Sequence, residues 1–255
     1  MQEMSDIELS KRVWTGGPAE GRPSSGQSSG QGSRQGSPQS SGQGSRQRWI
    51  SLGEFLVGAG LVIGHNVYHV IPNEVPILFV LGVISLRWRD GAIGLGRPAS
   101  WKRTAVIALA VAAVRILLGQ LVIDPVTAHF WPPAIAPAGS DDIAGNIKLA
   151  LFWLLISWTF AAFGEEIGYR GYLVRRAADA GGRSKAAYWA GVLAVSVLFG
   201  IGHYYKGPAG MIDSGMAGLI LGAAYVLSGR NLWVCILAHG FIDTFAVGAA
   251  FLGKG

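Results

Sequence analysis

Two adjacent glutamates and an arginine form the most informative group in this sequence. Glu165, Glu166 and Arg170 follow directly on an apolar run from Ile147 to Phe163. Ionisable groups are costly at membrane depth, and where they occur they usually face a bundle interior and mark a functional site. On a helix, Glu166 and Arg170 are four residues apart and can form an ion pair, whereas Glu165 lies about 100° away. Glu165 is thereby left free to act as a general base, unless all three charges simply lie at the water interface.

Two histidines stand in comparable surroundings later in the chain. His203 ends an apolar segment, and Gly202 leaves space beside its ring. His239 and Asp243 are four residues apart in the middle of another apolar segment, so a helix places them on one face. Asp243 would then hold one ring nitrogen of His239 and leave the other for chemistry or metal binding. The simpler interpretations are an interfacial His203 and a helix-packing hydrogen bond between His239 and Asp243.

Other candidates are weaker. His65 and His69 have the four-residue spacing of metal ligands, but no carboxylate accompanies them on that helix face, and we interpret them as structural or interfacial. Arg115 lies inside an apolar segment and requires an acidic partner that the sequence does not identify. The sequence contains neither the His-Glu-x-x-His string of soluble metalloproteases nor a phosphate-binding loop. The single cysteine, Cys235, is expected to be a small buried hydrophobic residue.

Membrane helices must position these residues. Half of the chain is hydrophobic and only 14% is charged, against about 25% in soluble domains. The apolar segments predict spans at roughly 49–71, 75–88, 104–123, 146–164, 186–202, 210–228 and 231–252. We therefore expect an all-α polytopic bundle of about seven to eight transmembrane helices. An eighth would come from 164–180, which either continues the fourth span or forms a separate amphipathic helix, and the proline-containing connection 124–145 is expected to be a loop.

The amino-terminal part has a different composition. Residues 1–48 are rich in Gly, Ser and Gln with little to bury, which predicts a disordered tail ahead of a membrane domain at 49–255. Basic residues collect in alternate connections between the apolar segments, which predicts a cytoplasmic amino terminus by the positive-inside rule. Because these residues form no single patch, the net charge of +6 does not indicate nucleic-acid binding.

Three motifs in order give the chain a family resemblance. Glu-Glu-x-x-x-Arg at 165–170, Phe-x-x-x-His at 199–203 and His-x-x-x-Asp at 239–243 each lie on their own apolar segment. This set resembles the CPBP intramembrane proteases, also called Abi, which include type II CAAX-prenyl endopeptidases and bacteriocin-processing or immunity proteins. The segment Gly94-Leu95-Gly96-Arg97-Pro98 is similar to a Gly-Leu-Arg-Arg-Pro-type segment of that family. The motif-bearing core covers about 146–245.

The resemblance implies roles for the first two motifs. Glu165 would activate the attacking water, and His203 would assist it. Glu166 and Arg170 would pair and shape the site. We expect this site to lie in the cytoplasmic half of the bundle.

The third motif is implied to stabilise the oxyanion. His239 and Asp243 would lie across the cavity from the attacking water. An ionised Asp243 would repel an oxyanion, so it would have to be protonated or orient His239 as a donor. Zinc held by Glu165, His203 and His239 is an alternative. The metal-free mechanism is preferred, because the sequence contains no compact ligand motif.

The resulting expectation is an intramembrane endopeptidase. It would act in a bacterial-type cell membrane, in contact with lipid, on a peptide or lipidated protein substrate that could be of the prenylated CAAX type. Two rival interpretations use the same buried charges without catalysis. One is a proton or ion path, and the other is a bacteriocin-immunity or scaffold role.

Overall fold

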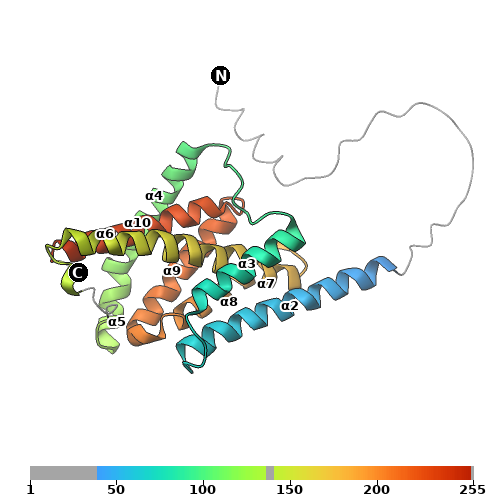
Figure 1. Cartoon of the computed structure of the whole chain (residues 1–255), viewed down its shortest axis with the longest axis horizontal. Coiled ribbons are helices and arrows are strands. Elements are labelled where there is room, and N and C mark those ends of the chain that lie inside the picture. Colours follow the sequence, from blue (N-terminus) through green and yellow to red (C-terminus); the bar gives the residue numbers. More distant parts are fainter. Residues whose placement is uncertain (1–38, 136–140, 254–255) are drawn as a thin grey trace, which may run out of the picture. The chain divides into compact units, whose positions relative to one another are not determined.

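The computed structural model describes residues 39–135 and 141–253, and every regular element within these ranges is helical. This confirms the all-α class, and the elements form a helical bundle (Figure 1). In chain order they are α2 (Gln39–Asn66), α3 (Glu74–Asp90), α4 (Trp101–Leu118), η1 (Gly119–Ile123), α5 (Asp124–Phe130), η2 (Asp141–Ile143), α6 (Ile147–Ile156), η3 (Ser157–Val174), α7 (Arg175–Ala180), α8 (Lys185–Ile201), η4 (Tyr204–Lys206), α9 (Gly207–Leu227) and α10 (Leu232–Phe251).

Several of these elements join into longer helices. Among the described residues, four helices are long and apolar enough to cross a membrane: Trp101–Phe130, Ile147–Ala180, Tyr204–Leu227 and Leu232–Phe251. The chain is thus a membrane protein, and α8 adds a shorter apolar helix. The segment 164–180 continues the fourth predicted span, because Ile147–Ala180 is one helix of 34 residues.

The prediction of a loop at 124–145 is wrong for its first residues. Residues 124–130 form α5, which continues the helix of α4 and η1. Pro125 lies in the first turn of α5, directly after the π-helical turn η1. Such a turn changes the local hydrogen-bond pattern and accommodates a proline that would otherwise break the helix.

Helix α2 begins before the predicted tail boundary at residue 48. Helix α2 starts at Gln39, so residues 39–48 are helical. Gln47 accounts for part of this order, because its carbonyl accepts a hydrogen bond from Ser51 (3.0 Å) and its side chain accepts one from Arg89 (3.3 Å). The remainder of the predicted tail, residues 1–38, lies outside the described residues.

Glycines allow the helices around the central helix Ile147–Ala180 to approach closely. A Cβ atom on Gly168 would lie 3.1 Å from the Leu78 Cβ of α3. On the other side of the core, a Cβ on Gly200 of α8 would lie 2.7 Å from the Met211 carbonyl oxygen of α9. Small residues at such crossings let membrane helices pack backbone to backbone, and they bring α3, α8 and α9 around the central helix.

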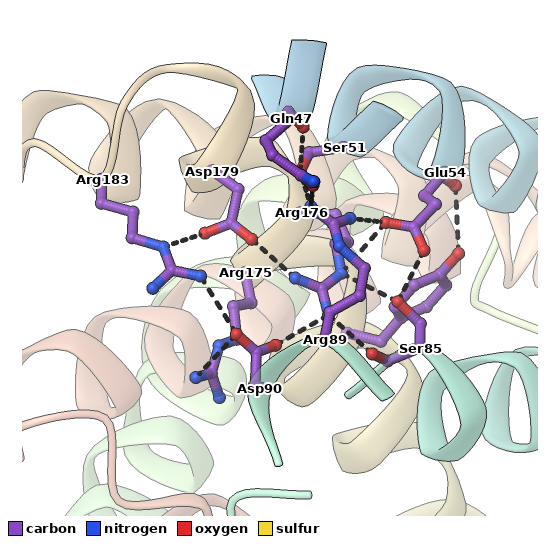
Figure 2. A network of polar contacts seen from close by, with 11 residues as sticks. Gln47, Ser51, Glu54, Ser85, Arg89, Asp90, Arg175, Arg176, Asp179 and Arg183 are labelled. Carbon is purple, nitrogen blue, oxygen red and sulfur yellow. Dashed lines mark hydrogen bonds and ion pairs between the residues drawn. The ribbon is translucent and has the colours of Figure 1, made fainter. Parts of the chain in front are cut away.

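A polar network closes one end of the bundle (Figure 2). Its centre is Arg176, which is fully buried and donates to Asp179 (2.6 Å), Asp90 (2.7 Å) and Ser85 (3.0 Å). Glu54 pairs with Arg176 at 3.2 Å. These contacts tie α2, α3 and α7 together at this end.

Further arginines extend the network. Arg89 pairs with Glu54, and Arg183 donates to Asp179 (2.5 Å) and Asp90 (3.0 Å). Burial raises the pKa of Asp90, but the guanidinium groups around it outweigh burial and hold this pKa below its usual value of 3.8. The carboxylate is therefore ionised at neutral pH, where it stabilises this end of the bundle.

Arg115 pairs with an acidic residue, as its position in an apolar segment requires. Its Nη2 donates to Asp213 Oδ1 at 2.5 Å, and the Arg115 residue is 8% exposed. This pair joins α4 to α9 across 98 positions of sequence, which explains why no local pattern could identify it.

Candidate active site

Glu166 and Arg170 form the predicted ion pair at the centre of the bundle. Arg170 Nη1 lies 2.8 Å from Glu166 Oε1, and the two side chains are 1% and 0% exposed. The guanidinium also donates to the Gly218 carbonyl (3.2 Å) and lies over the Phe199 ring, 4.5 Å from its centroid. Arg170 thereby connects η3 to both α8 and α9, and the pair holds these helices together.

The same glutamate orients His239. His239 Nδ1 lies 2.8 Å from Glu166 Oε1, and the Asp243 Oδ2 atom is 3.8 Å from Nε2, beyond hydrogen-bond distance. The structure therefore gives to Glu166 the orienting role that was predicted for Asp243. A carboxylate oxygen only accepts, so Nδ1 carries a hydrogen. Nε2 is the ring nitrogen that remains available on the Asp243 side.

Glu165 and His203 share a separate cavity of about 160 Å³. Glu165 Oε2 is buried without a hydrogen-bond partner among the described residues. His203 Nδ1 lies 2.8 Å from the Phe199 carbonyl oxygen. Because a carbonyl only accepts, Nδ1 carries the hydrogen, and Nε2 of the neutral ring is an acceptor. The cavity thus presents one carboxylate and one imidazole that can both accept a proton from water.

The structure divides the six motif residues into two groups. Glu165 and His203 line the cavity, as predicted. His239 was expected to point into the same cavity, but it is not among the described residues that line it. Its ring stands beside Phe199, 6.2 Å between centroids, and Phe199 also contacts His203 at 4.9 Å. Phe199 thus connects the two groups, and Asp243 belongs with His239.

The cavity lies at the end of α2 and α3 opposite to the polar network. It is lined by residues from the last turn of α2, the first turn of α3 and the turn after α8. The network instead involves Gln47, Ser51 and Glu54 of α2 and the end of α3. If the basic connections are cytoplasmic, as predicted, this cavity lies in the outer half of the bundle. The predicted orientation and the predicted position of the site in the cytoplasmic half both stay predictions.

Sequence reasoning missed part of the cavity wall. Glu74, Asn66 and Tyr169 line it together with His65, which was interpreted as structural or interfacial. Glu74 is 4% exposed, and its Oε1 accepts hydrogen bonds from Asn66 (2.9 Å) and Tyr169 (3.3 Å). A glutamate at the start of an apolar helix was the available signal.

His65 and His69 do not share a helix face. Helix α2 ends at Asn66, and His69 lies in the following turn with a φ of 55°. His69 is exposed, whereas His65 is half-buried at the cavity. The four-residue spacing of His65 and His69 therefore does not place the two rings on one helix face.

Zinc held by Glu165, His203 and His239 stays a prediction. The described residues contain no group of three His, Cys, Asp or Glu side chains placed to share a metal ion. Of the three proposed ligands, His239 has its Nδ1 bonded to Glu166, which leaves its Nε2 available, while Glu165 and His203 line the cavity. No catalytic step is therefore assigned to a metal.

Comparison with known proteins supports one family. A family model described as type II CAAX prenyl endopeptidase Rce1-like matches residues 147–245. No curated protein and no solved structure gave a match. The matched segment contains all six motif residues and ends before the last turns of α10, while α2 and α3 lie outside it.

Proposed function

We propose that this chain hydrolyses peptide bonds within the membrane by using water activated by Glu165, because residues 147–245 match the family model described as type II CAAX prenyl endopeptidase Rce1-like. The observation that carries the proposal is the unpartnered Glu165 oxygen in a cavity shared with His203. A carboxylate without a cation of its own can take a proton from water. The substrate class is a membrane-associated peptide or lipidated protein, including the prenylated CAAX type.

Glu165 and His203 each have a defined part in the proposed reaction. A water molecule that donates to Glu165 and to His203 Nε2 is oriented by two acceptors. As its oxygen attacks the scissile carbonyl, Glu165 takes one proton. His203 Nδ1 stays bound to the Phe199 carbonyl, which fixes the ring. The energetic gain comes from placing the base and the water before reaction.

His239 is proposed to stabilise the oxyanion under one condition. Its Nδ1 hydrogen is committed to Glu166, so only Nε2 can donate to the substrate oxygen. Donation from Nε2 requires both ring nitrogens to carry hydrogen. Glu166 on one side and Asp243 on the other would then flank the charged ring. Substrate would have to reach this nitrogen beyond the cavity seen here.

Hydrolysis without a metal is a direct test of this mechanism. We expect purified protein in lipid vesicles to cleave a lipid-anchored reporter peptide at an unchanged rate after chelation, since Glu165 and His203 supply the acceptors for water. Cleavage would be followed by mass spectrometry of the products, and metal content would be measured on the same sample. Stoichiometric zinc whose removal abolishes cleavage would contradict this expectation.

We further propose that the scissile bond is reached from the membrane face opposite the polar network, because the cavity is built at that end. Cysteine labelling in intact cells tests the side. Cys235 is fully buried and gives little background. A cysteine in place of exposed Tyr68 should react with a membrane-impermeant maleimide, whereas one in place of exposed Ala99 should react only after lysis. The reverse pattern would place the cavity on the cytoplasmic side.

A further inference from the structure

A second polar pair faces the cavity from outside the matched family segment. His65 ends α2 and Glu74 begins α3, and both line the cavity that holds Glu165 and His203. His65 Nε2 lies 3.6 Å from Glu74 Oε2. The side chain of His65 is 30% exposed and that of Glu74 is 5% exposed. The pair therefore connects a buried carboxylate to an imidazole that water can reach.

The hydrogen bonds of His65 identify the ring nitrogen that can carry a second proton. His65 Nδ1 lies 2.9 Å from the Ile71 carbonyl oxygen, which only accepts, so Nδ1 carries a hydrogen. In a neutral ring, Nε2 would then be an acceptor that faces a carboxylate oxygen. Glu74 Oε1 already accepts from Asn66 and Tyr169, which fixes the carboxylate in this orientation. Two acceptors face each other across 3.6 Å unless a proton resides on Nε2 or a donor enters between them.

From this arrangement we propose that His65 is the general acid that protonates the leaving amine and that Glu74 is its positioning residue. The inference rests on the proposed hydrolysis at Glu165. Amide hydrolysis needs such a group, because an amine is expelled only after its nitrogen receives a proton. Glu165 has no donor of its own before it takes the proton of water. A protonated Nε2 in the same cavity supplies the missing donor.

The proposed reaction is balanced in atoms and protons. Water adds its hydroxyl to the carbonyl carbon, and its proton passes to Glu165. The C–N bond then breaks, its electron pair stays on nitrogen, and the nitrogen takes the proton of His65 Nε2. Transfer of the Glu165 proton through water to His65 restores both groups. The sum is one water consumed, one carboxylic acid and one amine formed.

Two variants test the pair without removing its structural contacts. His65→Asn retains an amide N–H that can donate to the Ile71 carbonyl and lacks Nε2. Glu74→Gln retains an oxygen that accepts from Asn66 and Tyr169 and lacks the charge. The matched control is His69→Asn in the exposed turn, where asparagine tolerates the positive φ.

The decisive readout compares a peptide reporter with its ester analogue at the scissile bond. An alcohol leaves with much less need for a proton than an amine does. We expect both variants to lower kcat/KM about 100-fold or more on the amide, the usual range for a general acid, and less than about 10-fold on the ester. The His69→Asn control should match wild type on both substrates.

The other outcomes are equally informative. Equal losses on amide and ester would show a merely structural role and overturn the inference, as would an unchanged rate on the amide. In either case, a loss of activity in the Glu165→Gln variant would still support the proposed function. A wild type that cleaves neither reporter would overturn both the proposed function and this inference.

Discussion

Replacing Glu165 with glutamine should reduce peptide hydrolysis by about 10²- to 10⁴-fold, the usual loss when a general base is removed. The amide has the shape of the carboxyl group but cannot take a proton from water. Folding should be unaffected, because Glu165 Oε2 has no hydrogen-bond partner to lose among the described residues. The rate would be measured in a single turnover, and folding by thermal unfolding in detergent. A variant with the wild-type rate would remove Glu165 from the mechanism.

Replacing Glu166 with glutamine should instead lower the stability of the bundle. Arg170 is 1% exposed and loses its charged partner, and breaking a buried ion pair from one side costs about 3–5 kcal/mol. The amide oxygen can still accept from Arg170 and His239, so the variant should fold at reduced temperature. The measurement is the thermal midpoint in detergent, with Glu165→Gln as the matched control.

These two neighbouring substitutions separate catalysis from structure. Both exchange the same carboxylate for the same amide on one helix, one residue apart. We expect the first to change rate and the second to change stability. A Glu166→Gln protein with the wild-type midpoint would contradict the structural role that its contacts with Arg170 and His239 indicate.

Features that depend on local spacing could be predicted from the residues alone. Seven apolar segments predicted membrane spans; helices are found at all seven places, and among the described residues four helices are long and apolar enough to cross a membrane. The Glu166–Arg170 pair followed from four-residue spacing, because helix geometry places such residues side by side. The family resemblance was likewise local, since each motif spans a few residues of one helix, and the matched segment 147–245 contains all three.

The polar contacts between different helices depend on how the helices pack. Glu166 bonds His239 across 73 positions of sequence, and Arg115 bonds Asp213 across 98. In His239, this distant contact replaced the orienting bond that spacing had suggested with Asp243. Such pairs depend on helix packing, which close glycine contacts set and which leaves no periodic signal in the sequence.

The composition of the cavity was decided in the same way. His65 and Glu74 reach Glu165 and His203 only because α2 and α3 meet beside the central helix. The end of the bundle at which the cavity lies also follows from that meeting. A linear sequence fixes which residues are charged and which face of a helix they share. The position of that face relative to other helices is a property of the packed bundle alone.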